Sequence, residues 1–218
     1  MMQQDTICAI ATAQGGAIGV IRVSGPEAIS ITSRIFTPIG GKTLDERKPY
    51  TLTFGKILSS EGEVIDEVLV SVFRAPHSYT GEDSTEISCH GSSYILQQVM
   101  RRLIECGCRT ALPGEYTQRA FLNGKMDLSQ AEAVADLIAS TSTATHRMAM
   151  NQMRGGFSKE LSLLRDKLLH LTSLMELELD FSDHEELEFA DRTELSQIAD
   201  EIERVVVRLA QAGSVGNA

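Results

Sequence analysis

The sequence has no apolar run that approaches the roughly 20 residues needed to cross a bilayer, and its polar start, MMQQDT, lacks the features of a secretory signal. We therefore expect a cytoplasmic protein that has no membrane partner. Basic residues are also scarce, because 20 Lys and Arg stand against 30 Asp and Glu, and the net charge is −10. This balance argues against broad, non-specific nucleic-acid binding, which depends on neutralising phosphates with Lys and Arg. A local basic pocket is still compatible with it.

Cysteines are few, and their spacing indicates no metal site. The four of them, Cys8, Cys89, Cys106 and Cys108, do not pair at zinc-ribbon spacing, and nothing in their pattern indicates an oxidising compartment. We interpret them as reduced thiols at the ends of secondary-structure elements. A GxxxxGK[ST] loop is also absent from the sequence, so these residues cannot hydrolyse a nucleotide by the mechanism that such a loop supports.

Residues 1–120 carry short β-rich runs that glycine and proline separate. The expected strands are TICAIAT, IGVIRVSG, TLTFGKIL, EVIDEVLVSVFR and STEISCHG. One helix is expected to open at Pro26, and a second to run from about Ser92 to Glu105, followed by a last strand. This order predicts a mixed sheet with helices on one face, which is an α+β domain.

Residues 121–218 have a helical pattern and predict a second domain. Ser129 and Glu132 have the spacing of a capping box for the first helix. A second helix is expected after Gly155 and Gly156, with leucines three and four residues apart.

A third helix is expected to start near Asp191 and to end at Gly213. Because three such helices do not enclose one another, we expect an incomplete bundle that needs another helix or a partner chain. The acidic segment DFSDHEELEF before this helix lacks the spacing of an EF-hand, so we expect a solvated loop there.

The segment from Pro113 to Ile138, PGEYTQRAFLNGKMDLSQAEAVADLI, is the first candidate for a binding site. It places cationic, anionic and amide side chains close together in a short segment that contains a glycine and leads into a helix. We interpret it as a loop that binds a polar ligand. Its polar residues are Glu115, Arg119, Asn123, Lys125 and Asp127.

Two more residues join this candidate site from the expected strands. Arg22 lies within the apolar strand IGVIRVSG, where a cation must face solvent or meet an anion. Glu86 lies on one face of the strand that follows the polar turn HSYTGED. Together with Lys125, these residues suggest a pocket with an anion-binding side and an amide-binding side.

At these residues the sequence resembles a known family. The segments IGVIRVSG, YTGEDSTEISCHG and PGEYTQRAFLNGKMDLSQAEAVADLI, in this order and spacing, are similar to the N-terminal region of the tRNA modification GTPases called MnmE or TrmE. The resemblance extends over essentially the whole chain. It implies a tetrahydrofolate-binding domain like that of the aminomethyltransferase of glycine cleavage, followed by a helical domain into which a Ras-like GTPase domain is inserted.

The resemblance also implies an activity, cofactors and partners. Family members form the 5-carboxymethylaminomethyl group on the wobble uridine of tRNA together with an FAD-dependent protein, GidA or MnmG. Their N-terminal domain binds 5-formyltetrahydrofolate and forms a homodimer, while GTP, K⁺ and Mg²⁺ act in the GTPase domain. The family's folate-contacting residues match Arg22, Glu86 and Lys125. We expect Glu86 to accept the pterin amino group and ring N–H, and Arg22 and Lys125 to meet carboxylates or carbonyls.

Two other functions are kept as alternatives. A stand-alone folate-dependent one-carbon transferase would need a general acid or base, for which Asp127 and His90 are the candidates; a helix-capping carboxylate and a strand-end polar residue are the simpler interpretations. A scaffold that dimerises without a ligand is the other alternative. The chain also lacks the family's C-terminal cysteine motif and ends about where the GTPase domain is expected, so we expect a part of a longer protein.

Overall fold

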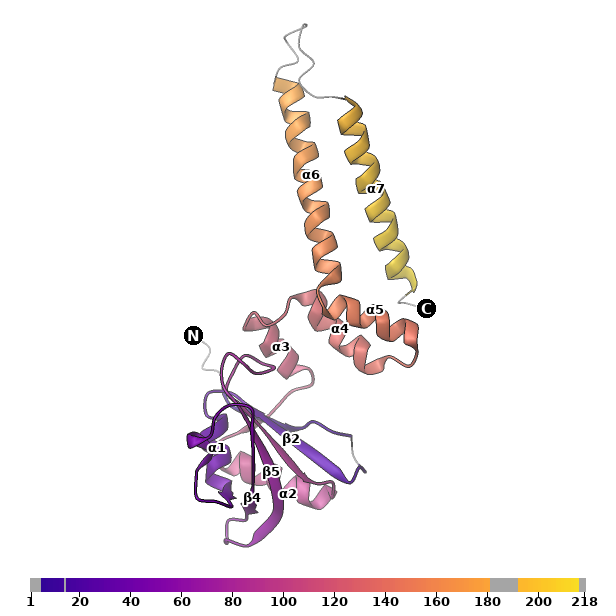
Figure 1. Ribbon diagram of the computed structural model, residues 1–218. Helices are drawn as coiled ribbons and strands as arrows, with labels where there is room; N and C mark the ends of the chain where they lie inside the picture. The colour runs from indigo at the N-terminus through magenta and orange to yellow at the C-terminus, as the bar shows by residue number, and fades with distance from the viewer. Residues whose placement is uncertain (1–4, 14, 181–191, 216–218) are drawn as a thin grey trace. The chain divides into compact units, whose positions relative to one another are not determined.

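The computed structural model describes residues 5–13, 15–180 and 192–215 of the chain, which form two compact units (Figure 1). The N-terminal unit extends to Met126, and the helical unit begins at Asp127.

A seven-stranded sheet forms the N-terminal unit, with the strand order β3-β4-β5-β6-β2-β1-β7. All neighbouring strands are antiparallel except β1 and β7, which are parallel. The mixed sheet that the sequence predicted is therefore confirmed. The strands are β1 (Ile7–Ile10), β2 (Ile18–Ser24), β3 (Phe36–Pro38), β4 (Thr51–Leu58), β5 (Val64–Phe73), β6 (Ser84–His90) and β7 (Arg109–Thr110).

One face of this sheet is apolar and carries the core. Along β5, Val68, Val70 and Val72 are buried, because side chains alternate between the two faces of a strand. The helices α1 (Ala28–Ile35) and α2 (Ser93–Glu105) pack on this face and bury residues such as Ile31 and Leu103. The opposite face, called here the outer face, is formed by the alternate residues of the same strands.

The segment after Pro113 contains a helix that sequence analysis interpreted as a loop. The helix α3 (Glu115–Leu122) begins directly after Gly114, and Asn123 is its C-cap. The glycine that follows, Gly124, has a φ of 69°, a left-handed conformation that favours glycine at a helix end. The prediction of a continuous loop was wrong because the turn residues at both ends of this helix masked its eight residues of helix-forming sequence. A short 3₁₀ helix, η1 (Leu44–Glu46), lies between β3 and β4.

The helical unit contains α4 (Leu128–Ala139), α5 (Thr143–Met153), α6 (Gly156–Asp180) and α7 (Arg192–Val215). The sequence predicted three helices because the break at residues 140–142 was not recognised. Ser142 caps α5 by accepting a hydrogen bond from the backbone N–H of Thr145.

The predicted capping box of α4 was also wrong. The cap is formed by Asp127 and Gln130, whose side chains each bond the other residue's backbone N–H. This pair starts the helix earlier, so Ser129 already lies inside it. The Ser129 hydroxyl is buried and has no hydrogen-bond partner among the described residues.

The helix α6 starts at Gly156, one residue before the predicted start, and α7 continues to Val215, two residues beyond the predicted end at Gly213. Asp191 and most of the predicted acidic loop lie outside the described residues. Leucines of α6 such as Leu161 and Leu168 are more than 40% exposed, which leaves the helical bundle incomplete, as expected.

Candidate functional site

Arg22 and Glu86 form an ion pair on the outer face of the sheet. They are register partners on β2 and β6, and their chain neighbours Ile21 and Ile87 point into the core. The Arg22 Nε and Nη2 atoms both donate to Glu86 Oε1, at 2.9 and 2.7 Å. About a quarter of each side chain is exposed, so the pair is shielded but still open to solvent. The structure thus brings two of the three predicted site residues together.

Two tyrosines flank the Arg22 guanidinium. Its central carbon lies 5.3 Å from the ring centre of Tyr79 and 5.6 Å from that of Tyr116, distances at which a cation is attracted to an aromatic ring. The Tyr116 hydroxyl donates to the Arg22 carbonyl at 2.7 Å, and burial raises the pKa of this tyrosine. The Tyr79 hydroxyl bonds Thr117 Oγ1 on α3 at 2.9 Å. Both rings are therefore fixed by bonds of their own.

Lys125 lies against the segment that carries Tyr79. Its Nζ donates to the Pro76 carbonyl at 2.9 Å. Gly81 has a φ of 79°, which favours glycine, and a Cβ atom added there would lie only 3.1 Å from Asn123 and 3.2 Å from Lys125. Asn123 Nδ2 donates to the Thr80 carbonyl at 2.7 Å. Residues 76–82, called here the 76–82 loop, therefore connect Lys125 to Tyr79. In the described structure Lys125 forms no hydrogen bond or ion pair with Arg22 or Glu86.

Glu115 and Arg119, which sequence analysis assigned to the ligand site, instead form a buried ionic cluster. Arg119 is 6% exposed and pairs with Glu82, Asp5 and Glu115. Arg109 pairs with Asp5 and Glu115 as well. The hydrogen bonds from Arg109, with smaller contributions from Arg119, lower the pKa values of Asp5 and Glu115 to about 2. The charges satisfy one another inside the unit, so the interpretation of Glu115 and Arg119 as ligand contacts was wrong.

The two candidates for a general acid or base have structural partners. His90 Nδ1 lies 2.7 Å from Asp66 Oδ1, and its backbone N–H donates to Asp66 Oδ2 at 2.8 Å. Asp127 caps α4, and hydrogen bonds from Ser158 and from the Gln130 backbone lower its pKa. The strand-end and helix-capping interpretations therefore hold for these two residues.

Tyr79 and Tyr116 were missed as site residues. Both stand inside the motifs that pointed to the site, YTGED and PGEY. Their position over one arginine depends on the folding of three separate segments, so it could not be read from their spacing.

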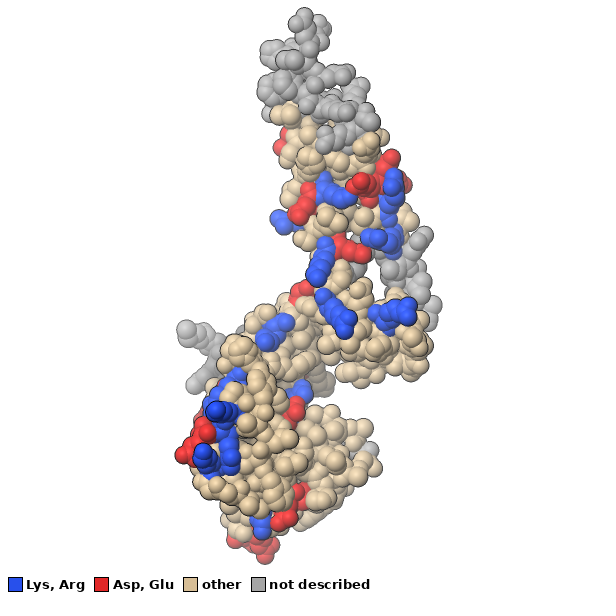
Figure 2. Space-filling view, viewed as in Figure 1, with Lys and Arg blue, Asp and Glu red and all other residues tan. Residues whose placement is uncertain are grey.

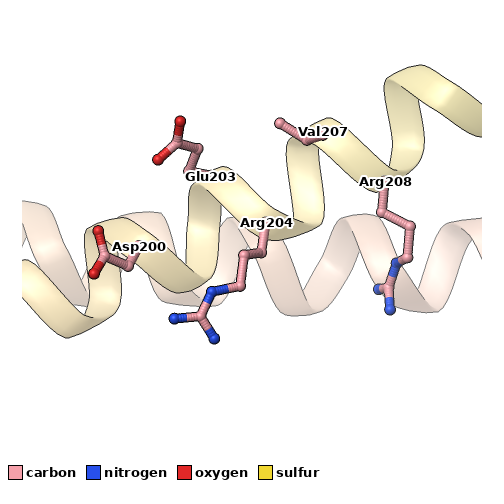
Figure 3. Close-up of a pocket in the computed structure, with 5 residues that line it drawn as sticks. All are labelled: Asp200, Glu203, Arg204, Val207 and Arg208. Carbon is pink, nitrogen blue, oxygen red and sulfur yellow. The ribbon is translucent and has the colours of Figure 1, made fainter.

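A shallow hollow of about 430 Å³ lies on α7 of the helical unit, and its lining does not form a convergent site. Arg204 and Arg208 point to one side of the helix, while Glu203 and Val207 point to the other (Figure 3). The Arg208 guanidinium pairs with Glu160 of α6 at 3.4 Å. The hollow is lined by Asp200, Glu203, Arg204, Val207 and Arg208. We assign no ligand to it.

Comparison with known proteins identifies the family. A family model described as GTP-binding protein TrmE N-terminus matches residues 6–125, which is more than half of the chain. The chain belongs to the MnmE/TrmE family. A second model, described as the MnmE helical domain, matches residues 128–217, so the resemblance seen in the sequence is confirmed over both units.

Relatives of the MnmE/TrmE family support the same assignment. Proteins named tRNA modification GTPase MnmE are 77% identical in Bacteroides thetaiotaomicron and 76% in Bacteroides fragilis, and each alignment covers at least 99% of this chain and 46% of the relative. The MnmE of Flavobacterium johnsoniae is 56% identical over 218 residues, with the same 46% of the relative covered. The chain therefore spans about half the length of the curated relatives it matches.

The relatives' name connects this family to tRNA modification. Within residues 5–13, 15–180 and 192–215, every helix is too short or too polar to span a bilayer.

Proposed function

We propose that this chain is the N-terminal part of a tRNA modification GTPase and that its N-terminal unit binds a reduced folate, 5-formyltetrahydrofolate, next to Arg22 and Glu86. The observation that carries this proposal is the ion pair between these residues, held on an open sheet face between two tyrosine rings. An ordinary surface ion pair contributes little to stability. Stability alone therefore does not explain why two tyrosine rings enclose this one. A pre-arranged cation and carboxylate do suit a ligand that has both donors and acceptors.

The hydrogen bonds of the pair leave atoms for a ligand. Both bonds from Arg22 go to Glu86 Oε1, and among the described residues nothing donates to Oε2. The Arg22 Nη1 group likewise has no acceptor within the described part of the chain. In this proposal Glu86 accepts the amino group and ring N–H of the pterin, and Arg22 donates to a carbonyl or carboxylate.

Lys125 completes the proposed site from its other side. Its ammonium group is exposed and bonds only the Pro76 carbonyl in the described structure. Exchanging one neutral acceptor for a carboxylate of the glutamyl tail gives a charge-assisted bond, which is stronger. This role requires the 76–82 loop to stay in place while the lysine changes its partner.

The same sheet face supports the proposal of a homodimer. Leu52, Phe54 and Leu69 point outward from β4 and β5 and are 66%, 45% and 41% exposed. In the strand register, Leu52 stands opposite Ser71, and Ser71 opposite Glu86. The apolar patch and the proposed folate site are therefore neighbours on one face, so a second copy that covers the patch would also approach the ligand.

The remaining activities of the family are proposed for the longer protein of which this chain forms a part. They are GTP hydrolysis with K⁺ and Mg²⁺ in a GTPase domain, and formation of the carboxymethylaminomethyl group on the wobble uridine of tRNA with the FAD-dependent GidA/MnmG protein in the cytoplasm. The family relationship and the relatives' name support this proposal.

Calorimetric titration of the 218-residue chain with 5-formyltetrahydrofolate tests the proposed site. Glu86→Ala is expected to weaken binding by about 30- to 100-fold, because it removes an acceptor of two charge-assisted hydrogen bonds. Glu67→Gln is the matched control, since Glu67 is a paired carboxylate on the neighbouring strand, and it should bind as the wild type does. Unchanged affinity in Glu86→Ala would refute the site.

The exposed apolar patch also favours the scaffold alternative, and the same titration separates the two. If the wild type binds no reduced folate and shows no thermal shift with any of them, while it still dimerises, the unit is a dimerisation module. A bound folate together with one-carbon transfer by the chain alone would favour the transferase.

A further inference from the structure

The helix α5 and its flanking turns form a basic segment in an acidic protein. No Asp or Glu occurs between Asp136 and Glu160, although the chain has 30 acidic residues. His146, Arg147 and Arg154 lie in this interval. In Figure 2, Lys and Arg side chains lie over the part of the helical unit that contains α5.

His146 and the two arginines of this segment lie on one stripe of α5 and its C-cap, together with other mostly polar side chains. A hollow of about 310 Å³ follows the helix there. Its lining residues recur at three- and four-residue intervals, which places them on one face of an α-helix. They are Thr143, His146, Arg147, Met150, Asn151 and Arg154.

Within the described part of the chain, no carboxylate forms an ion pair with either arginine of the stripe. Neither Arg147 nor Arg154 has an ion-pair partner within residues 5–13, 15–180 and 192–215, whereas Arg208 and Arg119 each pair with carboxylates. They are seven residues apart, which corresponds to about 10 Å along a helix. Two exposed guanidinium groups at this separation are suited to meeting successive anionic groups of an extended partner.

We propose that this α5 stripe binds the phosphate backbone of tRNA. Arginine forms bidentate bonds to phosphate oxygens, and asparagine and threonine are common neutral donors to the same groups. Binding to a hollow whose lining residues include two arginines and no acid reconciles a nucleic-acid substrate with a net charge of −10, because phosphate recognition depends on the local field. The proposal rests on the proposed function, which makes tRNA the substrate, and adds the surface that contacts it.

Fluorescence anisotropy with labelled, unmodified tRNA tests this proposal on the 218-residue chain at several salt concentrations. The double variant Arg147→Gln/Arg154→Gln is expected to weaken binding by roughly 10-fold at 0.1 M salt and to reduce the slope of log affinity against log salt by about 2. Both side chains are exposed, so the melting temperature should not change.

The control Lys56→Gln/Arg101→Gln removes the same formal charge from two cations of the N-terminal unit, a half-buried lysine and an exposed arginine, each of which already pairs with a glutamate. It should leave the affinity for tRNA within about twofold of wild type. Equal weakening by both double variants would overturn the proposal, because the effect would then follow net charge. An α5 variant that binds tRNA with wild-type affinity and slope would also overturn it.

A wild-type chain that binds 5-formyltetrahydrofolate but no tRNA would refute the α5 surface and leave the folate site standing. If the α5 double variant keeps tRNA binding and instead loses association with the FAD-dependent protein, the surface serves a protein partner, and the RNA proposal is wrong.

Discussion

Replacing Glu115 by Gln should destabilise the N-terminal unit in a pH-dependent way. The Glu115 side chain is 9% exposed and accepts from Arg109, from Arg119 and from the Leu112 backbone. These bonds, that from Arg109 foremost, lower its pKa from 4.5 to about 2. A carboxyl group whose pKa falls by this amount on folding contributes about 3 kcal/mol to the free energy of unfolding at neutral pH, since each pKa unit corresponds to about 1.4 kcal/mol.

The sign of the pH dependence follows from the direction of the pKa change. Because the folded-state pKa is below the unfolded one, the stabilisation by Glu115 is complete above about pH 4.5 and is lost as the pH falls toward about 2. Asp5 has a similarly lowered pKa, but about half of its side chain is exposed, so solvent screening reduces its contribution. We expect Glu115→Gln to cost about 2 to 3 kcal/mol at pH 7 and to converge with the wild type near pH 2.

Urea unfolding followed by tyrosine fluorescence measures this loss in the relevant unit. The chain has no Trp, and its four tyrosines, Tyr50, Tyr79, Tyr94 and Tyr116, all precede Met126. The signal therefore reports the N-terminal unit alone. Glu61→Gln, in the exposed turn between β4 and β5, is the control and should leave the midpoint unchanged.

Two results would contradict this role of Glu115. If Glu115→Gln is as stable as the wild type at pH 7, the ionic cluster does not stabilise the fold. If the difference between the two proteins persists undiminished at pH 2, the substitution acts through packing and not through charge.

Two shorter predictions concern the outer face of the sheet. Tyr116→Phe removes the 2.7 Å hydrogen bond to the Arg22 carbonyl and should cost about 1 kcal/mol of unfolding free energy together with a measurable loss of folate affinity; unchanged titration curves would show that this bond does not position Arg22. Leu69→Asp introduces a charge into the apolar patch of β4 and β5 and should shift the chain to monomer in sedimentation velocity. Ile138→Asp, at a residue that is 81% exposed in the helical unit, should not do so; a Leu69→Asp dimer would exclude this patch as the interface.

Sequence reasoning was most successful where local pattern determines structure. The β-rich run EVIDEVLVSVFR predicted β5, and the glycine pair at residues 155–156 predicted the start of α6 to within one residue. It failed where two local signals compete. Asp127-x-x-Gln130 and Ser129-x-x-Glu132 both satisfy the capping pattern, and only the former forms the cap.

In the candidate site, too, local motifs predicted which residues matter, while contacts between residues distant in sequence could not be predicted. The positions of Arg22 and Glu86 on adjacent strands could be inferred from motifs, but their pairing depends on the register of β2 with β6, which lies 64 residues further along the chain. The partners of Arg119 are equally remote, because Asp5 lies 114 residues away. A charged residue in a polar segment is therefore ambiguous by sequence alone. Arg119 was assigned to a ligand and belongs to the interior.

Helix α3 explains why the interior cluster and the proposed ligand site depend on one another. Tyr116 and Arg119 are three residues apart, so they extend from neighbouring positions of the helix; the first contacts Arg22 and the second contacts Glu82. Glu82 ends the loop that carries Tyr79, the other ring beside Arg22. The buried ion pairs therefore hold both the helix and the loop that supply the two rings. A buried ion pair often gains little over a well-packed apolar pair, although losing one partner is costly because the other charge stays buried and unpaired. For ligand binding, the fixed position of the two rings is therefore the more direct consequence of this cluster.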